Sequence, residues 1–199
     1  MNNVTESWKN SKVFQKQLEL NLKELTSKNP YPPHWNDFLR LINKYKPKNI
    51  LDVGCGCGAL YKLLNNELPS IEYYGVDYSE EAIEIAKKTW GKDRFSIKNY
   101  LSLDKEYVSK FDLLHLGALL DVLPNGDEAL EYIMSISPKS ILIGRMKLTD
   151  KDSYSETYKA YDEITTFAFY HNTDNFLQLC KKYGYVLDKI NNNIYLKRI

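Results

Sequence analysis

The chain has 199 residues, 43% of them hydrophobic and 27% charged, which suits one globular domain with a single large core. Its 27 lysines and arginines nearly balance its 26 aspartates and glutamates, so we expect no general attraction to nucleic acid or to an anionic membrane. No apolar run approaches the roughly 18 residues of a membrane-spanning helix, and the first residues lack the pattern of a secretory signal. We therefore expect a cytoplasmic protein.

The three cysteines point the same way. Cys55 and Cys57 lie in a glycine-rich loop, and Cys180 lies far from them in the sequence. An odd number argues against a disulfide framework and favours a reducing compartment. The spacing of Cys55 and Cys57 is too tight for a zinc-binding pair and no second pair follows, so we expect no metal site.

Two amphipathic helices are predicted at the start of the chain. Residues 11–27 place apolar side chains at helical spacing, and the prolines that follow break this helix. A second helix is expected to end near Lys46 and Pro47. We expect residues 1–47 to form a helical cap on a core formed by residues 48–199, within a single domain.

The chain then alternates between strands and helices. Short apolar runs predict five strands, at 49–53, 73–76, 94–98, 111–116 and 140–144. Helical faces lie between them, and Ser79 is an expected N-cap with acidic residues in the first turn after it. This alternation indicates a parallel sheet with right-handed crossovers.

The end of the chain differs. A helix carrying Phe176 and Cys180 is followed by two strands around Asn191–Asn193, which predicts an antiparallel hairpin. The whole pattern predicts an α/β fold: a three-layer sandwich built on a doubly wound, mostly parallel, seven-stranded sheet. Aromatic residues crowd the span 154–170, where Tyr154, Tyr158 and Tyr161 follow helical spacing. We leave open a helix packed on the sheet and an aromatic wall around a pocket.

The loop after the first strand is the strongest functional signal. Asp52 is followed by Gly54, Gly56 and Gly58, which alternate with other residues. Glycines allow a sharp turn and let a ligand approach the backbone. A loop at this edge of a doubly wound sheet lies where ligands bind.

Two carboxylates suggest what the ligand is. Gly54, Gly56 and Ala59 also fit the dinucleotide fingerprint, but Asp52 would repel a pyrophosphate and attract the ammonium group of an amino acid. Asp77 follows the second strand, where a carboxylate accepts hydrogen bonds from ribose hydroxyls. The antiparallel end of the sheet is also foreign to the dinucleotide-binding fold.

These segments resemble the class I, Rossmann-like methyltransferases that depend on S-adenosylmethionine. The stretch Ile50–Gly58 is similar to their first motif, Gly75–Ser79 to their second-strand motif, and Phe111–Leu116 to their fourth strand, with Leu123 and Pro124 after it. The resemblance covers about residues 49–199. It implies S-adenosylmethionine as the cofactor and methyl transfer as the reaction.

The resemblance also implies roles for individual residues. Gly54, Cys55, Gly56 and Gly58 would line the methionine portion, with Asp52 near its amino group. Asp77 would bind the ribose hydroxyls, and Tyr78 would pack on the adenine. The remaining residues implied in cofactor binding are Asn99, Tyr100 and Leu101 at the adenine edge, and His115 and Leu116 beside the sulfonium.

Catalysis needs alignment and, for a hydroxyl or protonated amine, a base. His171 is the first candidate because its segment commonly covers the acceptor pocket in the family that the chain resembles, and His115 is the second. Asp121 is a candidate by its loop position, and Arg145 because a cation after the fifth strand suits an anionic acceptor. Each histidine is also open to a structural role.

The substrate expected from the balanced charge and compact length is a small molecule or a saccharide, methylated on oxygen or nitrogen. Two other interpretations stay open: an NAD-dependent oxidoreductase, and a cofactor-binding module without turnover. Tyr31, His34 and Trp35 are further candidates for a lid over the cofactor, from their position alone.

Overall fold

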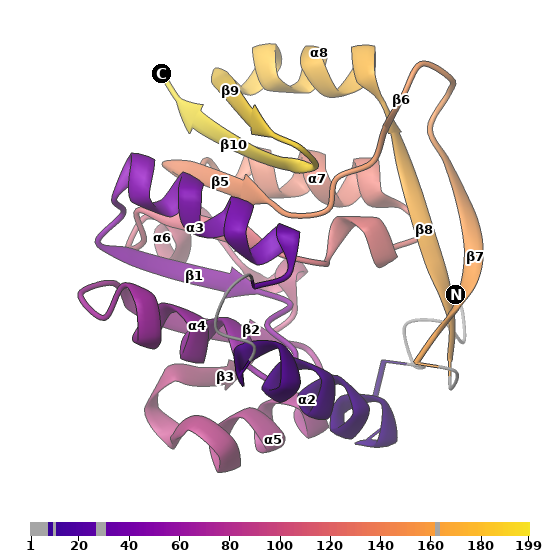
Figure 1. The fold of residues 1–199 in the computed structure, drawn as a ribbon. Helices are drawn as coiled ribbons and strands as arrows, with labels where there is room; N and C mark the ends of the chain where they lie inside the picture. Colours follow the sequence, from indigo (N-terminus) through magenta and orange to yellow (C-terminus); the bar gives the residue numbers. More distant parts are fainter. Residues whose placement is uncertain (1–7, 10, 27–30, 162–163) are drawn as a thin grey trace.

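The computed structural model describes residues 8–9, 11–26, 31–161 and 164–199 (Figure 1). Two helices, α2 (Ser11–Thr26) and α3 (Pro33–Tyr45), precede the sheet. Helix α3 begins with a proline, which needs no N–H donor there, and ends at Lys46 in the left-handed conformation before Pro47. Both helices lie where the sequence predicts them.

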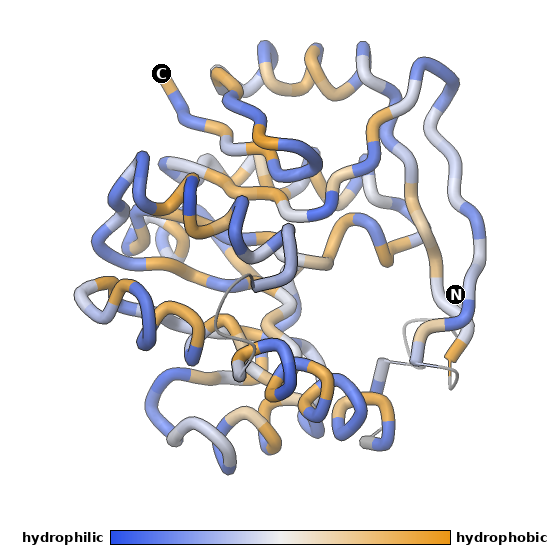
Figure 2. Tube along the Cα trace, in the orientation of Figure 1, coloured by the Kyte–Doolittle hydropathy of each residue, from blue (hydrophilic) through white to orange (hydrophobic). Residues whose placement is uncertain are grey.

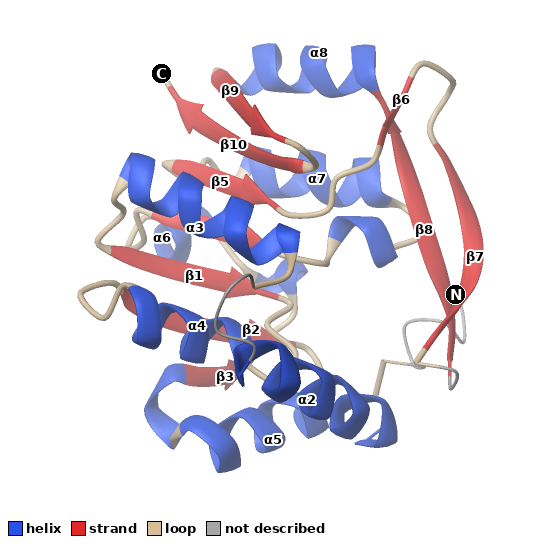
Figure 3. Ribbon diagram, viewed as in Figure 1, coloured by secondary structure: helices blue, strands red, loops and turns tan. Residues whose placement is uncertain are grey.

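A seven-stranded sheet forms the middle layer, in the order β3-β2-β1-β4-β5-β10-β9 (Figure 3). Its strands are β1 (Asn49–Val53), β2 (Glu72–Asp77), β3 (Phe95–Ile97), β4 (Leu113–Leu116), β5 (Ser140–Ile143), β9 (Tyr185–Ile190) and β10 (Asn193–Arg198). The first five pair in parallel, whereas β10 is antiparallel to both β5 and β9. The predicted α/β fold, with its antiparallel hairpin at the end, is confirmed.

Helices cover both faces of this sheet. One face carries α3, α4 (Ala59–Glu67) and α5 (Glu80–Trp90), and the other carries α6 (Lys105–Val108), α7 (Gly126–Ser135) and α8 (Thr173–Tyr183). Three single 3₁₀ turns lie in the connections: η1 (Lys92–Arg94), η2 (Tyr100–Ser102) and η3 (Leu120–Val122). Successive strand residues point to opposite cores: Ile50 belongs to the same core as Leu63 of α4, and Leu51 to the same core as Ile133 of α7. Because both faces are buried, the central strands are mostly apolar (Figure 2), with Asp52 of β1 and His115 of β4 as buried polar exceptions.

A second, smaller sheet was not foreseen. It consists of β6 (Leu148–Thr149), β7 (Tyr154–Ala160) and β8 (Ile164–Asn172), in the order β6-β8-β7. The helix considered for Tyr154, Tyr158 and Tyr161 is therefore wrong. Residues four apart share one face of a strand as well as of a helix, and Tyr154 stacks on Tyr170 across the strand pair with ring centroids 4.7 Å apart. The spacing of Tyr154 and Tyr158 fits both conformations, whereas Tyr161, which completes the helical pattern, lies just past the end of β7 with φ of 56°.

The β7–β8 hairpin stands apart from the large sheet, beyond the carboxyl ends of its parallel strands (Figure 1). The N-terminal segment joins it there, because the Trp8 indole donates a hydrogen bond to the Thr166 hydroxyl (3.1 Å) and Lys16 Nζ donates to the Tyr161 carbonyl (3.1 Å). Helix α2 and the hairpin thus meet above the edge of the sheet where the glycine loop lies. None of the described helices has the length and apolar character to span a membrane.

Candidate active site

The glycine loop connects β1 to α4 in a conformation that favours glycine. Gly54, Gly56 and Gly58 have φ values of 77°, 51° and 73°, in the left-handed region that side chains with a Cβ rarely adopt. The loop is held against β2, because the amides of Gly54 and Cys55 both donate to the Val76 carbonyl at 2.8 and 3.1 Å. The backbone at the end of β1 is therefore both bare and fixed.

Asp77 completes this loop from the end of β2. Its side chain is buried, and its two oxygens accept hydrogen bonds from the amides of Gly56 and Ser79, both at 2.9 Å. Burial raises the pKa of Asp77, and these amide hydrogen bonds oppose the rise. Each carboxylate oxygen keeps a further lone pair that can accept a hydrogen bond from a sugar hydroxyl.

A cavity of about 360 Å³ opens beside the loop and Asp77, within the usual range for sites that bind small molecules. Gly54, Gly56, Asp77 and Tyr78 line one end of it. Arg145 and residues 158–161 of the hairpin also line it, as do Trp8 and Phe14 of the N-terminal segment and Leu119, Leu123 and Pro124 after β4. Its walls therefore come from the sheet edge, the N-terminal segment and the hairpin together.

A smaller cavity of about 160 Å³ adjoins the first. Gln17, Gly54, Ala118, Arg145 and Tyr161 line both, so the two spaces meet at these residues. The smaller cavity is also lined by Asp52, Cys55, His34, Trp35 and His115. Helix α3 thus contributes two of the three residues considered for a lid.

Asp52 and His115 form a buried pair on neighbouring strands. Asp52 pairs with His115 in the register of β1 and β4, and its Oδ1 lies 2.7 Å from His115 Nδ1. Its Oδ2 accepts a hydrogen bond from the Tyr73 hydroxyl, also at 2.7 Å. Because a carboxylate only accepts, His115 Nδ1 carries the proton of this hydrogen bond, and in a neutral imidazole Nε2 would be the nitrogen with the lone pair. The ring edge that carries Nε2 lies under Gly117: a Cβ placed on this glycine would be 3.3 Å from Nε2.

His171, the first candidate for a base, lies elsewhere. Its side chain is 1% exposed, and its Nδ1 is 2.5 Å from Asp127 Oδ1 of α7. It lines neither cavity. Burial against Phe169 and Gly126 therefore places this imidazole in the packing between β8 and α7.

Asp121 and Arg145, by contrast, form one unit. Asp121 Oδ2 lies 2.8 Å from Arg145 Nη2. The carboxylate is buried, which raises its pKa, and Arg145 opposes the rise. Only Arg145 of the two lines the cavities.

Several residues implied in cofactor binding lie outside the two cavities. Asn99 Oδ1 accepts a hydrogen bond from the Leu101 amide and caps η2, and Leu101 is 57% exposed. Tyr100 packs against Tyr132 of α7, while Leu116 is fully buried in the sheet. Gly58 lies against Phe95. None of these residues lines the cavity beside Asp77 or the smaller one, and their roles stay predictions.

Gln17 of α2 is a site residue that sequence reasoning missed. Its Oε1 accepts a hydrogen bond from the Cys57 amide at 3.2 Å, and its Nε2 donates to the Tyr161 hydroxyl at 3.4 Å. The same oxygen lies only 2.5 Å from an ideal Cβ on Gly56. A polar residue one turn from Phe14, on the side of α2 that packs on the loop, was the available signal.

The residues present fit S-adenosylmethionine. This molecule joins an adenosine, with its ribose diol, to an amino acid through a cationic sulfonium. Here the glycine loop lies between the carboxylate of Asp77 at the end of β2 and that of Asp52 in β1. The loop leaves no room for a side chain at Gly56, because a Cβ there would meet Gln17. No pyrophosphate-binding cation takes part in the loop's described hydrogen bonds.

Comparison with known proteins gives the same result. A family model described as "Methyltransferase domain" matches residues 44–182, more than half of the chain. The chain is 32% identical over 82 residues to a release factor glutamine methyltransferase of Fusobacterium nucleatum, covering 38% of this chain and 23% of that protein. It is 38% identical over 52 residues to a trans-aconitate 2-methyltransferase of Pseudomonas paraeruginosa, covering 26% and 19%. The matches thus span about a quarter or less of these two relatives.

Solved structures share the fold. Magnesium protoporphyrin IX methyltransferase from Synechocystis, with bound S-adenosylmethionine, is 13% identical with a TM-score of 0.58, covering 83% of this chain and 78% of that one. A methyltransferase from Methanosarcina mazei is 16% identical with a TM-score of 0.58, covering 80% and 97%. The matching family model covers more than half of the chain, so the chain belongs to the methyltransferase domain family, and its sheet order and glycine loop give it the class I methyltransferase fold.

Proposed function

We propose that this enzyme transfers a methyl group to an oxygen or nitrogen atom of a small molecule or a saccharide. The supporting observation is the covered cavity. Trp8 and Phe14 line it together with residues 158–161 of the hairpin, so the space beyond Asp77 is walled on several sides. A small acceptor fits such a space, whereas a folded macromolecule would have to insert an extended segment. The balanced charge also favours a substrate other than nucleic acid.

We propose that the cofactor lies along the loop. Asp77 would accept hydrogen bonds from the ribose hydroxyls, and Tyr78 would pack on the adenine. Gly54, Cys55 and Gly56 would line the methionine portion, whose ammonium group would lie near Asp52. The support is that all six residues line the two adjoining cavities.

S-adenosylmethionine, when bound, supplies a methyl group already activated on its sulfonium. The chain's own residues must align the acceptor and remove its proton where one is lost. His115 fits this second role better than His171, because Asp52 fixes its Nδ1 as the protonated nitrogen and leaves Nε2 as the acceptor on a ring that lines the smaller cavity. We therefore propose His115 as the base.

The names of similar proteins leave the acceptor open. One similar protein is named for a glutamine in release factors and another for trans-aconitate. A third, EvdMO1, was solved with S-adenosylhomocysteine bound and is 13% identical. A direct assay is to incubate the purified enzyme with methyl-labelled S-adenosylmethionine and fractionated cell extracts. We expect label in the low-molecular-weight fraction; label confined to protein or RNA would contradict a small acceptor.

The cofactor assignment rests most on Asp77. Replacing it with alanine should weaken binding of S-adenosylhomocysteine by about 1–3 kcal/mol, roughly 5- to 150-fold, because two charge-assisted hydrogen bonds to the ribose are lost. Isothermal calorimetry measures this. Asp93→Ala, at an exposed position after α5, is the control. Since Asp77 also holds the loop amides, urea unfolding of both variants should show that the binding change is not a loss of folded protein.

A further inference from the structure

Arg145 occupies an unusual place at the edge of the sheet. It follows β5 after one glycine and adopts a left-handed backbone conformation, with φ of 59°. Such a conformation costs a residue with a Cβ free energy and is retained where the surroundings fix it. Arg145 lines both cavities, and its side chain is 46% exposed. The guanidinium therefore lies where the two spaces meet.

The buried carboxylate of Asp121 contacts this guanidinium from outside the cavity lining. Asp121 is 3% exposed and contacts Arg145 Nη2 at 2.8 Å. Its other oxygen, Oδ1, is buried without a hydrogen-bond partner among the described residues. A carboxylate held this far from water is costly unless it is paired. Asp121 is thus committed to one N–H group. The Tyr158 hydroxyl is a second neighbour that hydrogen-bonds the guanidinium, and the remaining donors can serve a ligand.

The packing around Asp121 makes the arrangement rigid. His171 of β8 lies close enough to affect the pKa of Asp121, and it is itself fixed by Asp127 of α7 at 2.5 Å. Its Nε2 is buried without a hydrogen-bond partner among the described residues. Elements β8 and α7 pack against η3, so the carboxylate that Arg145 contacts is fixed in place.

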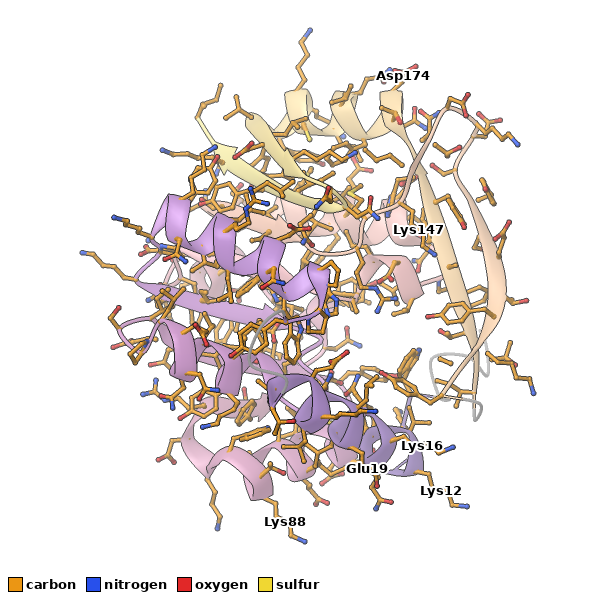
Figure 4. The ribbon with its side chains drawn as sticks, viewed as in Figure 1. Lys12, Lys16, Glu19, Lys88, Lys147 and Asp174 are labelled. Atoms are coloured by element: carbon orange, nitrogen blue, oxygen red, sulfur yellow. The ribbon has the colours of Figure 1, made fainter. Side chains whose placement is uncertain are left out.

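The polar side chains that line the large cavity near Arg145 are positively charged or neutral, and each can donate a hydrogen bond. Beside Arg145, the large cavity is lined by Lys159 and by the phenols of Tyr158 and Tyr161. The carboxylate of Asp121 lies behind Arg145, outside the lining, and Asp77 lines the end that we assign to the cofactor. Lys147, labelled in Figure 4, lies on the segment that leads from β5 towards β8, with its ammonium over the ring of Tyr170 at 5.0 Å.

We propose that Arg145 binds a carboxylate or phosphate group of the methyl acceptor, with Asp121 as the positioning residue that orients the guanidinium. The proposal rests on the proposed function, since it describes the acceptor of that same site. A planar guanidinium held at one nitrogen presents its remaining N–H groups in a fixed fork, which matches the oxygens of either anion. The acceptor is then an acid with an apolar body, matched by Val122 and Leu123 in the wall.

The amino-acid carboxylate of the cofactor is the competing ligand, because Arg145 also lines the smaller cavity. The test therefore uses protein saturated with S-adenosylhomocysteine, whose carboxylate already fills its own site. Benzoate, phenyl phosphate and the neutral benzamide are added separately, and saturation-transfer NMR measures their binding. The two anions distinguish a carboxylate from a phosphate preference.

We expect benzoate or phenyl phosphate to bind and benzamide to bind much more weakly. Arg145→Met should weaken the anion by about tenfold or more, and Arg145→Lys by less, because a lysine keeps the charge but lacks the fork. Asp121→Asn should weaken the anion while the affinity for S-adenosylhomocysteine stays the same, and urea unfolding should show that the variant is folded under the binding conditions. Arg40→Met, at a residue whose side chain is 71% exposed on α3, is the matched control.

Three results would overturn this assignment: benzamide binding as well as benzoate, no anion binding at all, or Arg145→Met weakening S-adenosylhomocysteine as much as the anion. The last would give the guanidinium to the cofactor. A wild-type protein that does not bind S-adenosylhomocysteine would instead refute the proposed function. The two failures are therefore distinguishable.

Discussion

At the scale of single residues, the glycines of the loop meet two different constraints. Gly54 and Gly58 both need a positive φ, but their surroundings differ. A Cβ on Gly54 would approach Leu119 Cδ1 at 3.4 Å, an ordinary contact, whereas a Cβ on Gly58 would lie 2.4 Å from Phe95 Cε1. The first glycine keeps the ligand side of the loop bare, and the last lets α4 begin directly against β3.

The close contact at Gly58 predicts how much stability an alanine substitution loses there. Gly58→Ala should destabilise the protein by roughly 1–3 kcal/mol more than Gly184→Ala, because overpacking against Phe95 adds to the backbone strain. Gly184 is the matched control: its φ is 72°, close to the 73° of Gly58, and the nearest atom to its Cβ position is a carbonyl 3.9 Å away. Urea unfolding measures both. Equal losses would mean that Phe95 moves aside freely.

At the scale of elements, α3 is fastened to the C-terminal hairpin. Lys44 Nζ and the Tyr45 hydroxyl both lie 2.7 Å from Asp188 Oδ2 on β9, and Tyr45 stacks on Tyr195 of β10 with ring centroids 3.7 Å apart. At the other end of α3, Asp37 accepts a hydrogen bond from Asn191 at 2.7 Å. These contacts hold the helix that lines the smaller cavity.

The Asp188 contact should make stability depend on pH. The hydrogen bond from Lys44, and next that from Tyr45, lower the pKa of Asp188 below its value in the unfolded chain. A lowered pKa gives stability that is present above the unfolded value of about 3.9 and is lost as the pH falls through it towards the folded value. Asp188→Asn should therefore reduce the drop in urea midpoint between about pH 6 and pH 3.

At pH 6 the same variant should lose only about 0–1 kcal/mol, as for other solvent-exposed ion pairs. Asp150→Asn, in the exposed connection between β6 and β7, is the control. Other carboxylates still contribute to the acid response, among them Asp112, whose pKa is lowered by the Lys48 amide. The pH dependence of the urea midpoint should therefore flatten only in part. An unchanged drop in Asp188→Asn would remove Asp188 from the acid response.

At the scale of the whole molecule, the site exists only where three parts meet. The sheet edge supplies Asp77, helix α2 supplies Gln17, and the hairpin supplies Tyr161, which Gln17 contacts. We propose that residues 1–199 act as one domain, with the N-terminal helices covering the core. A ligand in this space would then contact all three parts and stabilise them together.

Ligand binding should therefore raise the melting temperature. At about 100 times its dissociation constant, S-adenosylhomocysteine should stabilise the fold by about 2.7 kcal/mol. For a chain of this size that corresponds to roughly 5–11 °C. The Asp77→Ala variant at the same concentration should shift less. Differential scanning fluorimetry with NADH in parallel decides the class of cofactor, since a larger shift with NADH would contradict the methyltransferase assignment.

The sequence by itself determined the sheet, its helices and the binding loop. Their signals are local: the apolar run of β1, the positive φ that Gly54, Gly56 and Gly58 permit, and Asp77 at a strand end. Parallel strands bring their carboxyl ends to one edge, so Asp52 and Asp77 could be placed on the same side without coordinates.

Only the tertiary structure decided which side chains share the site. Nothing local distinguishes His115, which Asp52 orients beside a cavity, from His171, which is buried between β8 and α7. Nothing local shows that Asp121 holds Arg145, or that Gln17 reaches the loop from another helix. Burial and ion pairing depend on residues distant in the chain, and the tyrosine spacing of β7 fits a helix and a strand equally well. The glycine loop could be read from the sequence because its constraint lies within its own backbone.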